Sequence, residues 1–173
     1  MMMKSIIISL VGIFSLLQCL PKNSNMEKPQ SIKKNPYYSR TDSTPVKLSN
    51  EEWHKVLSPE LYSIAREAAT ERPFTGIYND FDKKGNYYCA ACGNHLFKSD
   101  YKFASSCGWP SFFEVNKEGV IYKRDSSHGM ERTEVLCKRC EAHLGHVFND
   151  GPPPTGIRYC MNSISLDFVP EGE

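Results

Sequence analysis

The chain has 173 residues, of which 40% are apolar, and its 21 basic residues almost balance its 20 acidic residues, for a formal net charge of +1. A chain of this length suits one compact domain with appendages. The even charge balance argues against the strongly basic face typical of nucleic-acid-binding proteins, so we expect no nucleic acid partner.

Residues 1–20 have the pattern of an export signal. A weakly basic start precedes twelve uncharged residues, Ile6–Leu17, which are too few to span a bilayer as a helix of about 20 residues. Leu16-Leu-Gln-Cys19 resembles the lipobox of bacterial lipoproteins, although Gln18 departs from the small residue usual there. We expect an exported protein, periplasmic or attached to a membrane through a lipid on Cys19. The alternatives are an ordinary signal peptide, discarded with Cys19, and a short uncleaved anchor.

Residues 21–48 are rich in Lys, Asn, Ser and Pro, a composition that predicts a flexible tether. The folded domain is then expected over residues 49–173. Its start carries two signals for short helices. Ser49-Asn-Glu-Glu52 is a capping-box pattern, and Ser58 precedes a proline that suits the first position of a helix.

Short strands are predicted over residues 119–123, 133–137 and 163–168. In the last of these, Ile164, Leu166 and Phe168 alternate with polar residues, as in a strand with one buried face. This alternation favours antiparallel sheets. The sequence therefore predicts a mainly β domain with short N-terminal helices.

Four of the seven cysteines form two Cys-x-x-Cys pairs, Cys89 with Cys92 and Cys137 with Cys140. Two such pairs can supply the four thiolates of a tetrahedral zinc site, whose role is structural because no coordination position stays open. Other soft metals would also fit. In an exported chain the same cysteines could instead form disulfides, and either pair alone could be a dithiol redox motif.

Cys160 stands apart from these pairs. If residues 158–162 are extended, Arg158, Cys160 and Asn162 share one face of a strand. A neighbouring cation lowers the pKa of a thiol, which makes Cys160 a candidate nucleophile. His143 and His146 could exchange a proton with a substrate. Both histidines could also be zinc ligands or buried core residues, and a lone cysteine in a strand is by default a small apolar residue.

A second single cysteine, Cys107, lies in an aromatic segment with Trp109, Phe112 and Phe113. The glycine and proline beside Cys107 predict a bent, exposed backbone. The aromatic residues are either core or, for Trp109, one wall of a small apolar pocket.

Five segments together resemble the B-type peptide methionine sulfoxide reductases, over about residues 50–169. They are Arg72-Pro-Phe-Thr-Gly76, Cys107-Gly-Trp-Pro-Ser-Phe112, Ser127-His-Gly-Met130, His143-Leu-Gly-His-Val-Phe148 and Arg158-Tyr-Cys-Met-Asn-Ser163. The resemblance implies a β-tent (Mss4-like) fold of two antiparallel sheets, and it identifies residues 49–173 as a catalytic domain. It also implies that the two cysteine pairs bind structural zinc.

The implied activity is reduction of methionine-R-sulfoxide in proteins or peptides, a repair of oxidative damage. Cys160 would attack the sulfoxide sulfur and become a sulfenic acid. Cys107 matches the resolving cysteine, which would close a disulfide with Cys160 for reduction by a thioredoxin-like dithiol. Since cytosolic thioredoxin would not reach an exported enzyme directly, a membrane-relayed or extracytoplasmic donor is expected.

The resemblance also implies roles for residues around the two thiols. His146 and His143 would supply protons, Asn162 would position substrate or a water, and Arg158 would favour the Cys160 thiolate. Trp109 matches the residue that holds the S-methyl group, and Phe112 is expected beside it in the substrate site.

Two other functions compete with the reductase. A zinc-stabilised binding module would need no reactive thiol, so its binding would survive loss of Cys160. A general thiol-disulfide oxidoreductase would act on disulfides without any sulfoxide, and its redox pair would normally be one Cys-x-x-Cys.

Overall fold

Two short helices precede the sheets in the part of the chain that the computed structural model describes, residues 34–172. The α1 helix (Asn50–Val56) begins after Ser49, whose hydroxyl accepts a hydrogen bond from the Glu52 N–H, while the Glu52 carboxylate accepts one from the Ser49 N–H. The α2 helix (Pro59–Glu67) begins after Ser58, whose side chain caps the N–H of Leu61. Both predicted helix starts are confirmed.

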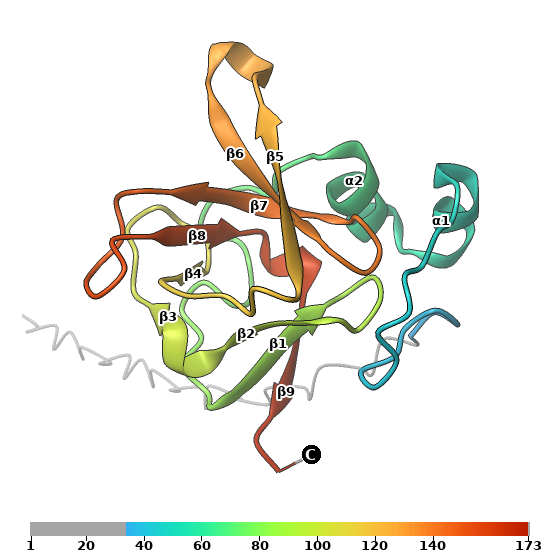
Figure 1. Ribbon diagram of the computed structural model, residues 1–173, viewed down its shortest axis with the longest axis horizontal. Coiled ribbons are helices and arrows are strands. Elements are labelled where there is room, and N and C mark those ends of the chain that lie inside the picture. The colour runs from blue at the N-terminus through green and yellow to red at the C-terminus, as the bar shows by residue number, and fades with distance from the viewer. Residues whose placement is uncertain (1–33, 173) are drawn as a thin grey trace, which may run out of the picture. The chain divides into compact units, whose positions relative to one another are not determined.

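The described residues also form nine strands in two antiparallel sheets, which confirms the predicted fold class (Figure 1). The smaller sheet has the order β2-β1-β9, and the larger has the order β3-β4-β8-β7-β6-β5. The strands are β1 (Gly85–Cys89), β2 (His95–Lys98), β3 (Lys102–Phe103), β4 (Ser111–Phe112), β5 (Val120–Asp125), β6 (Arg132–Cys137), β7 (His143–Phe148), β8 (Arg158–Met161) and β9 (Leu166–Pro170). Three 3-10 turns complete the elements: η1 (Ser99–Tyr101), η2 (Ser127–Gly129) and η3 (Ser163–Ser165).

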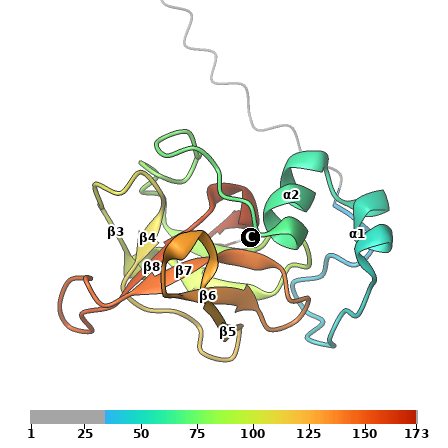
Figure 2. The ribbon, with the colours of Figure 1, turned by 90° about the horizontal axis from the view of Figure 1, so that it is seen from above.

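The core lies between the two sheets. Phe112 of the larger sheet stacks on Phe97 of the smaller, with ring centroids 4.3 Å apart, and the ring of Tyr87 meets Phe112 edge-on at 5.0 Å. All three side chains are completely buried. The helices lie together at one side of the sheets (Figure 2), where α2 packs on β7 and η3. No helix between residues 34 and 172 has the length and apolar character needed to cross a membrane.

The predicted strand over residues 163–168 is wrong in its first half. Residues 163–165 form η3, in which Ser163 and Ser165 are buried and Ile164 is exposed, the reverse of the expected pattern. The serines are buried because each has a partner: the Ser163 hydroxyl accepts from the Tyr78 N–H, and the Ser165 hydroxyl donates to the His143 carbonyl. Satisfied hydrogen bonds remove the cost of burying a polar side chain.

The export signal and residues 21–33 of the tether lie outside the described residues. The rest of the predicted tether, residues 34–48, is bonded to the domain, so the folded unit begins before residue 49. Arg139, which is 5% exposed, holds this segment. Its guanidinium pairs with Asp42 at 3.1 Å and donates to the carbonyls of Tyr37, Ser39, Thr44 and Cys92. The composition suggested flexibility because it carries no sign of this buried partner.

Arg139→Ala is expected to lower the free energy of unfolding by about 3 kcal/mol, because the buried Cys92 carbonyl and three partly buried carbonyls lose a charged donor. Urea unfolding measures this loss, and limited proteolysis should then cut within residues 34–46. Lys138→Ala is the matched control, since Lys138 makes only an exposed ion pair with Glu118. Equal stability of the two variants would contradict the anchoring role.

Candidate active site and metal centre

A row of side chains crosses four neighbouring strands of the larger sheet. Ser111 on β4 lies opposite Cys160 on β8, Cys160 lies opposite His146 on β7, and His146 lies opposite Glu134 on β6. Directly opposed residues of antiparallel strands place their side chains on the same face, with Cβ atoms about 5 Å apart. The pairing therefore sets the predicted nucleophile beside one of the predicted proton donors.

A β-bulge in β7 brings His143 to the same site. In a regular strand, residues 143 and 146 would point to opposite faces. The pairing of β6 with β7 shifts by one residue between Val135 and Leu136, so that Leu144 is the extra residue. As a result the rings of His143 and His146 are neighbours, with centroids 5.4 Å apart. Bulges of this kind commonly re-aim side chains at active sites.

Both predicted redox cysteines meet at this row. The Sγ atoms of Cys107 and Cys160 are 3.6 Å apart, and both residues are partly buried free thiols. Cys107 also lies 3.4 Å from the Ser111 hydroxyl, which places it at the end of the row. Closing a disulfide, with a sulfur–sulfur bond of about 2.05 Å, requires only a small further approach.

The two thiols differ in their readiness to ionise. Burial by itself would raise the pKa of Cys107, but hydrogen bonds to Ser105, to Ser111, to the backbone of Trp109 and to Cys160 outweigh it and lower this pKa to about 7. Burial, followed by the charge and the hydrogen bond of Cys107, raises the pKa of Cys160 to about 12. Of the pair, Cys107 therefore ionises first.

Arg158 has the predicted effect on the Cys160 thiol, but burial and Cys107 outweigh it. Arg158 lowers the pKa of Cys160, yet burial and Cys107 have larger, opposite effects. The guanidinium is itself engaged in a two-bond contact with Asp150, at 2.8 Å for each bond, and lies 4.5 Å from the centre of the Phe148 ring. Arg158 therefore favours the Cys160 thiolate in the expected direction, but its effect is smaller than that of burial and Cys107.

A small cavity of about 100 Å³ opens beside Cys160. Besides Cys160, its lining includes three predicted site residues, Trp109, His146 and Asn162, together with Thr70, Arg132, Gly145, Phe148 and Met161. The Trp109 indole is partly buried and is fixed by a 3.1 Å hydrogen bond from Nε1 to the Glu71 carbonyl. This volume suits a group of a few heavy atoms, such as the end of a methionine side chain.

Asn162 lines the cavity, but its amide serves the framework. Its Oδ1 accepts from the Glu71 N–H at 3.0 Å, and its Nδ2 donates to the Leu144 carbonyl at 3.2 Å. The Glu71 carboxylate in turn accepts from the N–H groups of Ser163 and Ile164. Glu71 thus connects Trp109, Asn162 and η3, a role that nothing in its local sequence signals.

Phe112 does not belong to the substrate site. Its ring is fully buried between Tyr87 and Phe97, so the predicted binding role is wrong and the core interpretation holds. The cause is register: Phe112 follows Ser111, which shares a face with Cys160, and therefore points to the opposite side of β4. Phe148 is the phenylalanine that reaches the cavity.

Each histidine bonds to a carboxylate that the sequence interpretation missed. His143 Nδ1 lies 2.7 Å from Glu134 Oε1, and His146 Nε2 lies 2.8 Å from Asp125 Oδ2. Burial lowers the pKa of His143, partly offset by Glu134. The two histidines differ in access, because His146 lines the cavity whereas His143 is almost fully buried behind it.

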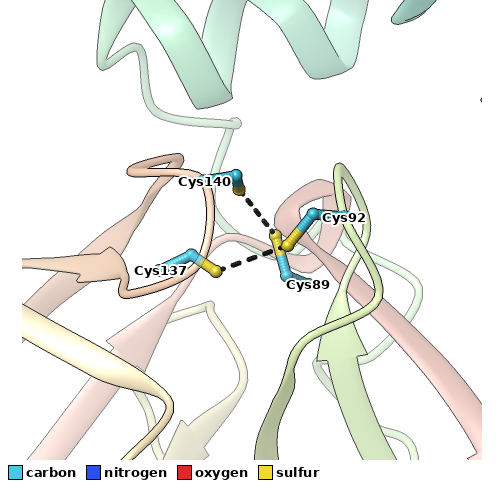
Figure 3. Close-up of side chains that lie close together, drawn as sticks. All are labelled: Cys89, Cys92, Cys137 and Cys140. Carbon is cyan, nitrogen blue, oxygen red and sulfur yellow. Dashed lines mark hydrogen bonds between the residues drawn. The ribbon is translucent and has the colours of Figure 1, made fainter. Parts of the chain in front are cut away.

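Four buried cysteines form the candidate metal centre. Cys89 and Cys92 on one turn face Cys137 and Cys140 on another (Figure 3), and their sulfur atoms all lie within 4.8 Å of one another. The Cys89–Cys140 and Cys92–Cys137 distances are 3.7 and 3.6 Å. Tetrahedral zinc with sulfur at about 2.3 Å requires sulfur atoms about 3.8 Å apart, so the thiols fit this ion. Neither histidine belongs to the cluster, which argues against the interpretation of them as zinc ligands.

Known proteins resemble this chain over the part that builds the site. A family model described as the SelR domain matches residues 57–170. Two relatives are named peptide methionine sulfoxide reductase MsrB: one from Leptospira interrogans is 58% identical over 73% of this chain and 97% of its own length, and one from Thiobacillus denitrificans is 56% identical over 75% and 98%. A third, from Bradyrhizobium diazoefficiens, bears the same name and is 56% identical over 77% of this chain and 96% of its own length.

Cys107→Ser is expected to lower the pKa of Cys160, because the two largest influences after burial both come from Cys107. The rate of iodoacetamide alkylation at Cys160, followed against pH by peptide mass spectrometry, measures the change. The alkylation midpoint should move to lower pH than in the reduced wild-type protein. An unchanged midpoint would show that burial alone sets the pKa.

Proposed function

The chain belongs to the SelR domain family of peptide methionine sulfoxide reductases, and on this premise we propose that it reduces methionine-R-sulfoxide in proteins or peptides to methionine. The observation that carries the proposal is the close contact of the thiols of Cys107 and Cys160, 3.6 Å apart, beside the small cavity that Trp109 and His146 line.

In the first step the Cys160 sulfur attacks the sulfoxide sulfur. The oxygen is transferred to Cys160 as a sulfenic acid, so that methionine gains two electrons and Cys160 loses two. The high pKa of the resting Cys160 means that its proton must leave as the attack occurs. The ionised Cys107, which lies next to it, is the available acceptor for that proton.

The oxygen must gain protons as its bond to the methionine sulfur breaks, and we assign this role to His146. The side chain of His146 lines the cavity and stands opposite Cys160 in the sheet. General acid catalysis by a positioned side chain typically accelerates such a step by about 10²- to 10⁴-fold. His143, behind the cavity, then supports the arrangement through Glu134.

The residues that line the cavity provide a physical basis for selecting one epimer of methionine sulfoxide. A sulfoxide sulfur carries a methyl group, an oxygen and a lone pair in fixed handedness. If the methyl group lies against Trp109 and the oxygen faces His146, only one epimer turns its sulfur toward Cys160. We assign Trp109 the methyl contact on this ground.

In the second step Cys107 attacks the sulfur of the Cys160 sulfenic acid. A sulfur–sulfur bond forms and the oxygen leaves as water after protonation. An external protein dithiol of the thioredoxin type would then reduce the disulfide by exchange and itself become oxidised. If residues 1–20 direct export, the donor must reach the chain outside the cytosol, whether the chain is periplasmic or attached to a membrane through Cys19.

We also assign zinc to the four-cysteine cluster. Cys89, Cys92, Cys137 and Cys140 supply four buried thiols at the spacing that zinc requires, and four thiolates leave no open position. Bound zinc would join the turn after β1 to the turn after β6. Its contribution is to the stability of the fold, since the cluster and the cavity have no residue in common.

The proposal is tested by supplying separate R and S epimers of a methionine sulfoxide peptide to the reduced protein with dithiothreitol. Turnover should be confined to the R epimer and should be lost in Cys160→Ser. Cys107→Ser should retain turnover with dithiothreitol and lose at least about tenfold with a thioredoxin-like donor, which needs the disulfide. Absence of turnover of both epimers by the metal-replete protein would favour a binding module.

Metal analysis of the purified protein should give one zinc ion per chain, retained in Cys160→Ser and lost in Cys137→Ser. Apparent zinc-binding free energies at such sites are about 10 to 16 kcal/mol, so metal loss should unfold the domain. Circular dichroism before and after chelation measures this. A folded, metal-free protein with the four cysteines in disulfides would contradict the assignment.

A further inference from the structure

Asp125 lies at the end of β5, in the hairpin that extends beyond β7 at the top of Figure 1. One oxygen of its carboxylate, Oδ2, is shared by two donors: Arg132 Nη2 at 2.6 Å and His146 Nε2 at 2.8 Å. The other oxygen, Oδ1, accepts from the Ser127 N–H at 2.9 Å. Three contacts therefore fix the carboxylate against Arg132 and His146, two residues that line the cavity.

These contacts also keep Asp125 ionised. The hydrogen bonds from Ser127, followed by the contact with His146, hold the pKa of Asp125 well below its usual range. Its side chain is 16% exposed and that of Arg132 is 20% exposed, so solvent screens the pair only partly. Asp125 thus places a negative charge in direct contact with His146.

The carboxylate bonded to Nε2 determines which ring nitrogen of His146 is free to donate a proton to a substrate. Neutral histidine carries one N–H, and a bond to Asp125 retains that hydrogen on Nε2. When the ring is protonated, the additional hydrogen is on Nδ1, and Nδ1 is then the atom from which a proton can leave.

We propose that Asp125 is a positioning residue for the reduction step: it fixes the orientation of His146 and selects Nδ1 as the proton-donating atom. The inference rests on the proposed function. Arg132 and Ser127 lie next to Asp125 at the tip of the same hairpin, and their hydrogen bonds hold its carboxylate in place.

Two other charged groups near the ring of His146 are already engaged in contacts with other residues. Glu134 is bonded to His143 and lies opposite His146 without a bond to it, and Arg132 is neutralised by Asp125. The titratable or charged groups that face the ring are Asp125 on β5, Arg132 and Glu134 on β6, His143 on its own strand and Cys160 on β8. Asp125 alone among the carboxylates of residues 34–172 makes a hydrogen bond to His146.

The test compares Asp125→Asn with Glu131→Gln in the full chain, with the R-sulfoxide peptide and dithiothreitol. Glu131 is on the same hairpin and pairs only with exposed Arg124, so its variant removes the same charge away from the site. We expect Asp125→Asn to lower kcat by about tenfold or more. Glu131→Gln should match the wild type.

A double-mutant cycle with His146→Ala separates positioning from a general structural role. If Asp125 acts through His146, Asp125→Asn should cause no further loss in the His146→Ala background. Equal losses in the two backgrounds would overturn the inference. If Asp125→Asn does not fold, Asp125→Glu replaces it: the charge is kept and displaced, so kcat should fall, and wild-type kcat would overturn the inference.

The wild-type protein in the same assay distinguishes a failure of the proposed function from a failure of the inference about Asp125. Absence of wild-type turnover would refute the proposed function and the inference together. Wild-type turnover with Asp125→Asn indistinguishable from Glu131→Gln would refute the inference alone.

Discussion

The close approach of β8 to β7 at Gly145 is the constraint on which the site depends. A Cβ atom at this position would lie 2.1 Å from the Cys160 carbonyl oxygen and 2.9 Å from the Met161 Cα, so only glycine allows the two strands to pair here. Their pairing sets His146 opposite Cys160, and the adjacent bulge turns His143 to the same face. One residue without a side chain thus aligns the thiol with its acid–base neighbours.

Competition among burial, charge and hydrogen bonding decides the chemistry of the two thiols. Arg158 is a permanent cation near Cys160, yet its guanidinium is shared with Asp150, and burial together with Cys107 has the larger effect. Of the reduced pair, Cys107 therefore ionises at the lower pH. In the proposed reaction this arrangement protects Cys160 from unselective oxidation and supplies an acceptor for its proton.

The rest of the fold fixes the site from outside. Glu71 connects the loop before the cavity to Trp109, Asn162 and η3 through four hydrogen bonds of its backbone and carboxylate. Arg139, within the second cysteine pair, binds residues 37–44, a segment outside the stretch that the SelR model matches. The turn that carries the second cysteine pair therefore also anchors the segment that precedes the SelR domain.

Local pattern was enough to predict the helix caps at Ser49 and Ser58 and the grouping of four cysteines, because short motifs encode them. The family resemblance predicted that Cys107 meets Cys160. Tertiary structure alone decided the rest. The side of a strand to which Phe112 points, the burial of Ser163 and Ser165, and the pairing of His146 with Asp125 depend on register, on a bulge and on partners from distant segments. Such contacts arise when strands pair in three dimensions, and no short stretch of sequence specifies them.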